Sequence, residues 1–472
     1  MKTVSVKRFW FVPAAVSAGL LLLLLSGCLE KHLVWSPDGS RAAVIAKDGL
    51  HFCDPEGKLT PLLLPDVYQV AWLGDSQRLV VARERKVGDW TSIARMLGPE
   101  RVGKVASETE SLWKQLETGG KWGILTMELG KKKDQAVLKI FLRERYGDAL
   151  RAKLSVGEWD ELKSQQAEIS ELVMARIVGE QIQPGTLLHE GLERINDLRV
   201  SPGDRAVAFT TDMALDNDKE CRLLLARIDA TGAVTVAEHT GTYPDWTADG
   251  RALAYVQASG GAKDDLRLGT LVSREVLDEN GQNRIAEKPA ELAGLLFGNA
   301  NASRVRCLQD GRILFNSGEF NLPVATKDAD VEQDKLFAWD PARQATLVRM
   351  VPRGGEENLP KSLTFFEVSP DEKQVLVGGR SGEVSVLTLA TGDVQEWQKA
   401  GDYNLMGAPV WRNAEEITYA RRNPTVEGKK PLRKAEIVLR KAVPGKGDQE
   451  KVLSRDWSND MLESVFSGSD KK

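Results

Sequence analysis

The sequence of 472 residues is 28% charged and 42% hydrophobic, a balance typical of a folded globular protein and not of a disordered chain. Its formal net charge is −4, and its longest basic run is the three residues Lys131 to Lys133. A weakly acidic chain without a basic tract offers no electrostatic surface for nucleic acid, so we expect no nucleic-acid partner.

The first element in chain order is an export signal. A basic end precedes an uncharged run that finishes in six leucines, Leu20 to Leu25, and Ser, Gly and Cys28 follow. A basic end, an apolar segment and small residues before a cut are the parts of a secretory signal. The Leu-Ser-Gly-Cys stretch resembles the lipobox of bacterial lipoproteins, which implies that residues 1–27 are removed and that Cys28 is lipidated. An uncleaved membrane anchor is the alternative.

Either alternative places the rest of the chain outside the cytoplasm. We expect a protein of the cell envelope, attached to the membrane through its N-terminal lipid. Leu29 follows the lipidated cysteine, and in a diderm host this resembles sorting to the periplasmic face of the outer membrane.

After the signal, one short pattern occurs seven times. Each copy has an apolar residue, then a polar or Gly/Pro turn, then a short strand-like run, as in "LVWSPDGSRAAVI" from Leu33. Asp, Gly and Pro supply the dihedral angles of a tight turn, so each copy predicts a β-hairpin. We name the apolar residue the anchor position. It is occupied in turn by Trp35, Trp72, Val200, Trp246, Cys307, Val368 and Trp411.

A second, weaker hairpin follows most copies, with turns such as Asp54–Gly57 and Asp229–Gly232. Two hairpins make a four-stranded sheet, and such sheets bury both faces when they pack radially. Most anchor positions also have the spacing of propeller blades, about 40–50 residues or slightly more. We expect the following residues to be structural, as blade anchors or in the turns beside them: Trp35, Trp72, Trp246, Trp411, Asp38 and Asp249.

The repeat also resembles a known family. Trp35 to Gly39 read Trp-Ser-Pro-Asp-Gly, and Pro244-Asp245-Trp246 and Pro409-Val410-Trp411 match the same pattern in part. The pattern is similar to the TolB-type, WD-like propeller repeat. The resemblance implies an all-β fold, a β-propeller of seven four-stranded blades, with six as the alternative. Because propellers serve many unrelated functions, it implies little about activity.

One gap between anchor positions is too long for a blade, since residues 72 and 200 lie 128 positions apart (200 − 72). We expect an insertion inside blade two at residues 86–184. It divides the chain into the signal at 1–27, propeller segments at 28–85 and 185–457, and a tail at 458–472.

The insertion is predicted to be mainly helical. Val102, Val105, Leu112 and Leu116 have helical spacing, and Ser155 with Glu158 predicts a capping box. A further apolar stripe runs from Leu162 through Leu172 to Ile177 and predicts another helix, whereas residues 124–142 are compatible with a helix or a hairpin.

A search for catalytic and metal-binding patterns is negative. The nearest relative of a Gly-x-Ser-x-Gly motif, at Gly378–Glu383, has the wrong spacing, and the four histidines form no metal motif. The acidic loops Asp212–Glu220 and Asp328–Asp334 lack the Gly and distal Glu of an EF-hand. One imperfect copy of a quinone-dehydrogenase repeat occurs at Ala390–Trp397. We therefore expect no catalytic residue, no metal, no cofactor and no enzymatic activity.

These patterns favour a lipid-anchored propeller that acts as a protein–protein interaction scaffold for partners in the cell envelope. Two alternatives stay open. One is a small-ligand or glycan sensor, which predicts a polar or aromatic-lined pocket in the central channel. The other is an enzyme with a nonstandard site there, which predicts convergent carboxylates.

Overall fold

The computed structural model describes residues 32–129, 134–213, 217–258, 267–297, 304–319, 332–343, 347–349, 363–379, 383–399, 404–405, 407–422, 434–441 and 450–458. The predicted signal and Cys28 lie outside the described residues. Among the residues that are described, a search for helices long and apolar enough to span a bilayer finds none.

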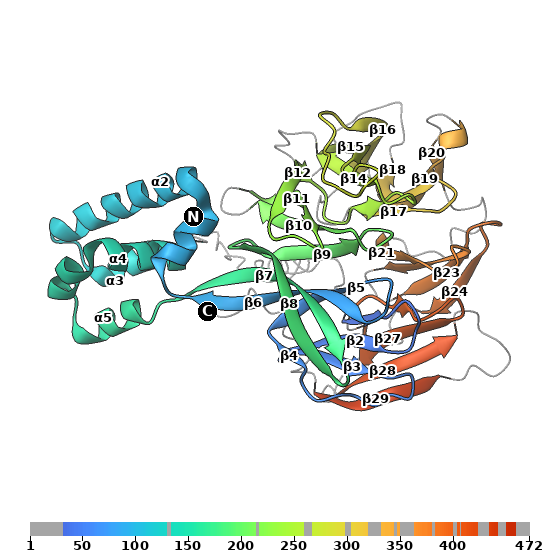
Figure 1. Ribbon diagram of the computed structural model, residues 1–472, viewed down its shortest axis with the longest axis horizontal. Helices are drawn as coiled ribbons and strands as arrows, with labels where there is room; N and C mark the ends of the chain where they lie inside the picture. The colour runs from blue at the N-terminus through green and yellow to red at the C-terminus, as the bar shows by residue number, and fades with distance from the viewer. Residues whose placement is uncertain are drawn as a thin grey trace, which may run out of the picture.

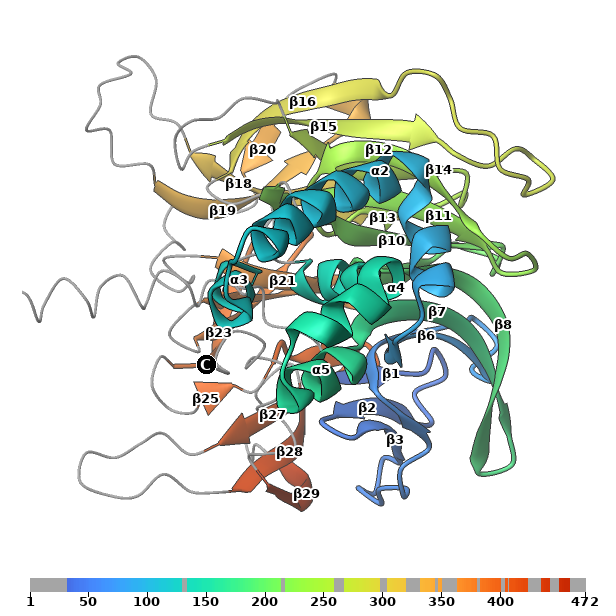
Figure 2. The same cartoon turned by 90° about the vertical axis from the view of Figure 1, so that its left-hand side faces the viewer.

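The chain folds as a β-propeller, with antiparallel sheets that follow one another around a ring in chain order (Figure 2). The first sheet is β1 (Leu33–Trp35), β2 (Ala42–Ala46), β3 (Gly49–Cys53) and β4 (Leu64–Pro65). The second is β5 (Val67–Trp72), β6 (Arg78–Val87), β7 (Ala167–Val178) and β8 (Gln181–Gly191). The third is β9 (Ile195–Val200), β10 (Ala206–Met213), β11 (Asn217–Arg227), β12 (Ala233–Thr240), β13 (Asp245–Trp246), β14 (Ala252–Ala258), β15 (Arg267–Glu275) and β16 (Ala290–Phe297).

Three more sheets complete the ring. The fourth is β17 (Val305–Cys307), β18 (Ile313–Glu319), β19 (Glu332–Trp339) and β20 (Leu347–Arg349), with the 3-10 turn η2 (Pro341–Arg343) before β20. The fifth is β21 (Leu363–Val368), β22 (Gln374–Gly379), β23 (Val384–Thr388) and β24 (Val394–Gln398). The sixth is β25 (Asn404–Leu405), β26 (Val410–Trp411), β27 (Glu416–Arg422), β28 (Lys434–Lys441) and β29 (Lys451–Ser458).

The number of separate blades differs from the prediction. Among the described strands, five sheets have the size of one blade, with four or five strands each, and the sheet of β9–β16 has eight. Seven separate four-stranded blades, and the alternative of six, are therefore wrong. The reason is one residue pair, because Thr240 at the end of β12 pairs with Gln257 in β14 and joins two four-stranded halves into one sheet.

Every anchor position is the last residue of the innermost strand of its repeat, and the four tryptophans there are buried. Three of their indole N–H groups donate to the carbonyl oxygen just before the anchor position of the preceding repeat. The pairs are Trp72 to Val34 at 2.8 Å, Trp246 to Arg199 at 2.8 Å and Trp411 to Glu367 at 3.0 Å. The tryptophans therefore join each repeat to the previous one by packing and by a hydrogen bond.

The ring closes between the first and last sheets, which share no strand among the described residues. The indole N–H of Trp35 donates to Thr418 Oγ1 on β27 at 2.9 Å. One apolar cluster joins the first sheet, through Leu33 and Val44, to the last sheet, through Ile437 and Leu439. Non-covalent packing between these two sheets thus holds the ring shut.

The turns after the anchor positions share one backbone feature. The fourth residue after the anchor has a positive φ in six of the seven repeats: Gly39, Ser76, Asp204, Gly250, Gly311 and Glu372. Each non-glycine side chain in this set accepts an N–H from the turn of the preceding repeat. The pairs are Asp38 to Ser76, Gly74 to Asp204 and Gln309 to Glu372. Hydrogen bonds between repeats thus offset the backbone strain at these positions.

Between β6 and β7 the described residues form four helices: α2 (Trp90–Glu117), α3 (Trp122–Leu129), α4 (Gln135–Lys153) and α5 (Val156–Lys163). We call them the helical arm. Their apolar cluster includes Ile93, Leu138 and Leu150 and extends to Val87 of β6 and Ile169 of β7. The arm stands away from the ring at the end of the long β6–β7 ribbon (Figure 1). In the view along the ring axis, it lies in front of the sheets (Figure 2).

Two predictions about this region can be compared with the arm. The capping box at Ser155 and Glu158 is confirmed at the start of α5. The helix predicted from Leu162 to Ile177 is wrong, because Ala167–Val178 is strand β7 and pairs with β6 along ten residues of its length. Residues 167–184 of the predicted insertion therefore belong to the second sheet.

Polar contacts fix the arm at both of its connections. The guanidinium of Arg143 on α4 donates to the carbonyl oxygens of Gly88, before the arm, and of Lys163, at its end. Arg95 on α2 contacts Glu190 on β8 at 2.7 Å, and Arg101 donates to Glu193. These contacts tie the base of the arm to β8 and to the segment that follows β8.

Candidate binding site in the central channel

Side chains of the innermost strands line a cavity in the central channel. Successive side chains of a strand point to opposite sides, so the anchor residue packs between sheets while its neighbour faces the channel. The cavity has a volume of about 360 Å³, and Pro37 of the first turn lines it. Since Pro37 follows an anchor position, the cavity reaches the face of the ring that carries the turns.

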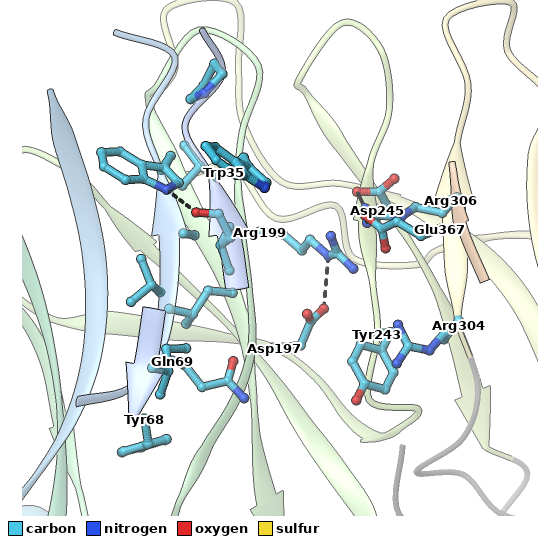
Figure 3. A pocket seen from close by; sticks show the side chains of 18 residues that line it. Trp35, Tyr68, Gln69, Asp197, Arg199, Tyr243, Asp245, Arg304, Arg306 and Glu367 are labelled. Carbon is cyan, nitrogen blue, oxygen red and sulfur yellow. Dashed lines mark hydrogen bonds and ion pairs between the residues drawn. The ribbon is translucent and has the colours of Figure 1, made fainter. Parts of the chain in front are cut away.

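The two sides of this cavity differ in chemistry. The first two repeats contribute mainly neutral side chains, among them Val34, Ala71 and Gln69. The next four repeats contribute the charged side chains and one aromatic ring: Asp197, Arg199, Tyr243, Asp245, Arg304, Arg306 and Glu367. The strands β9, β13, β17 and β21 place the residues of this second group, or end next to them, and Figure 3 shows how they face one another.

Arg306 connects three repeats. Its guanidinium contacts Glu367 at 2.9 Å and Asp245 at 3.4 Å, and each of the three side chains is about 15% exposed. Burial lowers the pKa of Arg306, but the nearby carboxylates of Glu367, Asp245 and Asp197 outweigh it and raise the pKa above its ordinary value. Arg306 is therefore a fixed cation that holds two carboxylates in place on one wall of the cavity.

Asp197 and Arg199 form the second ion pair, with 3.0 Å between Oδ2 and Nε. Asp197 has a φ of 37°, and the register of β9 against β10 shifts at this residue. A bulge of this kind redirects a side chain, and a non-glycine residue with positive φ has a backbone cost. Both side chains extend toward the middle of the cavity (Figure 3).

Tyr243 and Arg304 complete the charged side. The guanidinium of Arg304 lies 4.0 Å from the centroid of the Tyr243 ring, a cation–π contact. Arg304 itself is 4% exposed, and its backbone N–H donates to Asn316 Oδ1. The pair lies on the charged side of the cavity (Figure 3).

Most residues singled out in the sequence lie around this cavity rather than in it. Trp35 and Trp72 line it from the neutral side. Asp38 and Asp249 lie in the turns, where each accepts hydrogen bonds from neighbouring turn residues. Hydrogen bonds from Ser36 and Ser40 hold the pKa of Asp38 at about 2. These two aspartates therefore have a local structural role.

The histidines are separated by the fold: His32 before β1, His51 in β3, His189 in β8 and His239 in β12. Within the described part of the chain, no group of three or more His, Cys, Asp or Glu side chains is arranged to hold a metal ion. The acidic loops considered for calcium lie partly outside the described residues.

The sequence analysis missed the charged residues of the channel. Arg199, Asp245, Arg306 and Glu367 each occupy the position just before an anchor, so aligning the seven repeats at that position shows four charges in succession. An inner strand that carries a charge toward a channel is an informative exception to apolar packing. That signal was present in the sequence.

No protein-family model matches the chain, and no curated protein matches it in sequence. Several solved structures are similar to it. A protein assigned as TolB from Agrobacterium tumefaciens is 10% identical, with 58% of this chain and 85% of that chain covered and a TM-score of 0.37. An oligogalacturonate lyase from Vibrio parahaemolyticus is 13% identical, with 75% of each chain covered and a TM-score of 0.40. A prolyl endopeptidase is 11% identical, with 90% of this chain and 50% of that chain covered and a TM-score of 0.47.

These comparisons correct one prediction. The expectation that the chain is not an enzyme does not stand, because the similar solved structures include a lyase and peptidases beside the TolB protein. With identities of 10%, 13% and 11% and TM-scores of 0.37, 0.40 and 0.47, these likenesses assign no activity to this chain. A propeller fold is compatible with catalysis and with binding, so the site itself has to decide between them.

Proposed function

We propose that this chain is a lipid-anchored cell-envelope propeller that acts as a protein-interaction scaffold and binds its partner at the charged side of the central channel. The observation that supports the proposal most is the convergence of Asp197, Arg199, Asp245, Arg306 and Glu367 from four repeats on one cavity. Charged groups that are partly desolvated and held by ion pairs give an interface specificity and orientation.

The position of the cavity supports the same proposal. It reaches the turn face of the ring, whereas β6 and β7 extend to the helical arm from the opposite end of the inner strands. A partner could therefore approach the cavity without displacing the arm. The arm has exposed apolar side chains of its own at Ile124 and Met127, which are 52% and 66% exposed.

The test is capture of partners from an envelope extract by the mature chain, residues 28–472. The channel variant is Arg199→Gln, with Arg176→Gln as the matched control, since Arg176 is exposed on β7. A second variant replaces residues 90–163 with a short Gly/Ser linker, which leaves the β6–β7 pairing intact. We expect Arg199→Gln to lose the partner and the other two to keep it. Loss of the partner only in the variant without the arm would contradict the proposal.

A polar small-ligand sensor is the second candidate function. It is supported by the aromatic and charged lining of the cavity, where Tyr243 and Arg304 make a stacking surface. A ligand in this cavity would stabilise the folded chain without any protein partner. A rise in melting temperature with a small polar ligand, unchanged in the arm deletion, would favour the sensor.

The lipid anchor is a proposal on the sequence at Leu25 to Cys28. We expect metabolic labelling with an alkyne fatty acid to mark the chain. Cys28→Ala should lose the label and should no longer be found in the membrane fraction. A labelled Cys28→Ala chain would contradict it.

A further inference from the structure

The ligand class of the channel follows from which polar groups there have donors to spare. Arg306 is engaged by two carboxylates, and Arg304 lies against Tyr243. Arg199 uses only Nε, in its contact with Asp197, so among the described residues both of its terminal amino groups remain for a ligand. The side-chain amide of Gln69 on β5 points into the same cavity (Figure 3).

The geometry points to a carboxylate as the group that this cavity recognises, and we infer that Arg199 is the residue that binds it. A guanidinium offers two parallel N–H donors that match the two oxygens of a carboxylate. Asp197 fixes the orientation of the guanidinium from the side of Nε. The Arg199 fork is therefore held ready before a ligand arrives, which reduces the entropy lost on binding.

The surroundings favour one carboxylate with a small body. Three carboxylates already face the cavity, and Arg306 or Arg199 pairs with each of them. A ligand with several negative charges would be repelled by them, whereas a single carboxylate at Arg199 adds one negative charge to a cavity that three guanidinium groups line, Arg199, Arg304 and Arg306. The volume of about 360 Å³ lies at the lower end of the range for small-ligand pockets.

Two sources present a single carboxylate of this kind: the C-terminal end of a partner's peptide chain, and a free sugar acid. The inference depends on the proposed function, because the peptide end would be that of the envelope partner. The Arg199 chemistry is common to both sources. Binding measurements with defined probes separate them.

The experiment measures binding to the full-length chain by calorimetry with three probes: N-acetyl-trialanine with a free carboxylate, the same peptide as its amide, and glucuronate. We expect the free peptide or glucuronate to bind and the amide not to bind. Arg199→Lys keeps the charge but loses the fork and should weaken binding about 10-fold, and Arg199→Gln about 100-fold. Arg176→Gln, the exposed control, should bind as the unaltered chain does.

Binding by the free peptide alone identifies a peptide terminus, and binding by glucuronate alone identifies a sugar acid. Equal affinities in the unaltered chain and in Arg199→Lys and Arg199→Gln would overturn the inference, as would absence of binding by both carboxylates. If Arg199→Gln is poorly folded, the inference is tested by the affinity of Arg199→Lys and by the comparison of the free peptide with its amide. An Arg199→Gln chain that loses the probes but keeps the envelope partner would support this inference and contradict the proposed function.

Discussion

Two sets of residues alternate along the same short inner strands, and they have different roles. The anchor positions, such as Trp35 and Trp246, point between the sheets and are buried with their indole groups hydrogen-bonded. The positions just before them, such as Arg199 and Arg306, point into the channel. Packing between sheets demands the same kind of residue in every repeat, whereas the channel does not. The anchor residues of an inner strand can therefore hold the ring closed, while the residues that face the channel differ from repeat to repeat.

The largest effect is expected at the ring closure. Trp35→Ala removes a buried indole between the first and last sheets and its hydrogen bond to Thr418. Truncating a buried tryptophan costs about 3–5 kcal/mol, and here the loss falls between two sheets that share no described strand. Urea unfolding measures the loss in the free energy of unfolding. Binding of the carboxylate probes at low urea is the control that the channel is still formed. A loss below about 1 kcal/mol would mean that the anchor residues do not hold the ring.

The next effect concerns the channel ion pairs. Arg306→Gln leaves the carboxylates of Asp245 and Glu367 without their cation in a partly desolvated site. Breaking a buried pair costs about 3–5 kcal/mol, and because these side chains keep some exposure we expect about 2–4 kcal/mol. Arg199→Lys should cost far less stability while it affects binding more. Equal losses of stability in Arg306→Gln and Arg199→Lys would contradict the assignment of Arg306 to stability and of Arg199 to binding.

The pH dependence gives a third test, at His32 beside the first inner strand. Burial lowers the pKa of His32 from 6.5 to about 4, so the folded chain holds it neutral while the unfolded chain protonates it below pH 6.5. This stability is complete above pH 6.5 and is lost as the pH falls toward 4, about 2–3 kcal/mol at pH 4.5. Burial lowers the pKa of His189 as well and adds to the loss. In His32→Gln, the free energy of unfolding should fall less between pH 7 and 4.5 than it does in the unaltered chain. An unchanged dependence on pH would contradict this account.

The smallest effects compare two turn residues of positive φ. An added Cβ at Gly250 would lie 2.9 Å from the Pro202 carbonyl oxygen, so Gly250→Ala should cost about 1–2 kcal/mol. Asp204→Gly relieves backbone strain but removes the hydrogen bond from Gly74, so we expect a change within about 0.5 kcal/mol. Thermal unfolding of both variants measures the difference. Equal losses would show that the hydrogen bonds between turns do not offset the strain.

The same alternation explains how much the sequence could predict. The anchor pattern repeats, so the propeller and its turns were readable from residues such as Trp35 and Trp246. Arg199, Asp245 and Arg306 share the position before the anchor, so the aligned repeats place them all on the channel side. Which of these charged residues pair with one another depends on how the ring forms and has no counterpart in the spacing along the chain. The joining of two repeats into one sheet depends on a single pair, Thr240 and Gln257, which no local pattern indicates.

The helical arm shows a different limit. Its long helices follow from apolar periodicity, and the capping box at Ser155 is local. The end of the insertion was misread because the apolar residues of β7, including Ile169 and Leu172, also fit a helical stripe. Only the pairing of β7 with β6, which is separated from it by the whole arm, decides for a strand.

The most direct test of the proposed binding face is photo-cross-linking in envelope extract. A photoreactive phenylalanine replaces Pro37, which is exposed and lines the cavity on the turn face, or Met127, which is exposed on α3 of the arm. Partner binding at the channel predicts a cross-linked product from position 37 and none from position 127. A product from position 127 alone would place the partner on the arm and contradict the account.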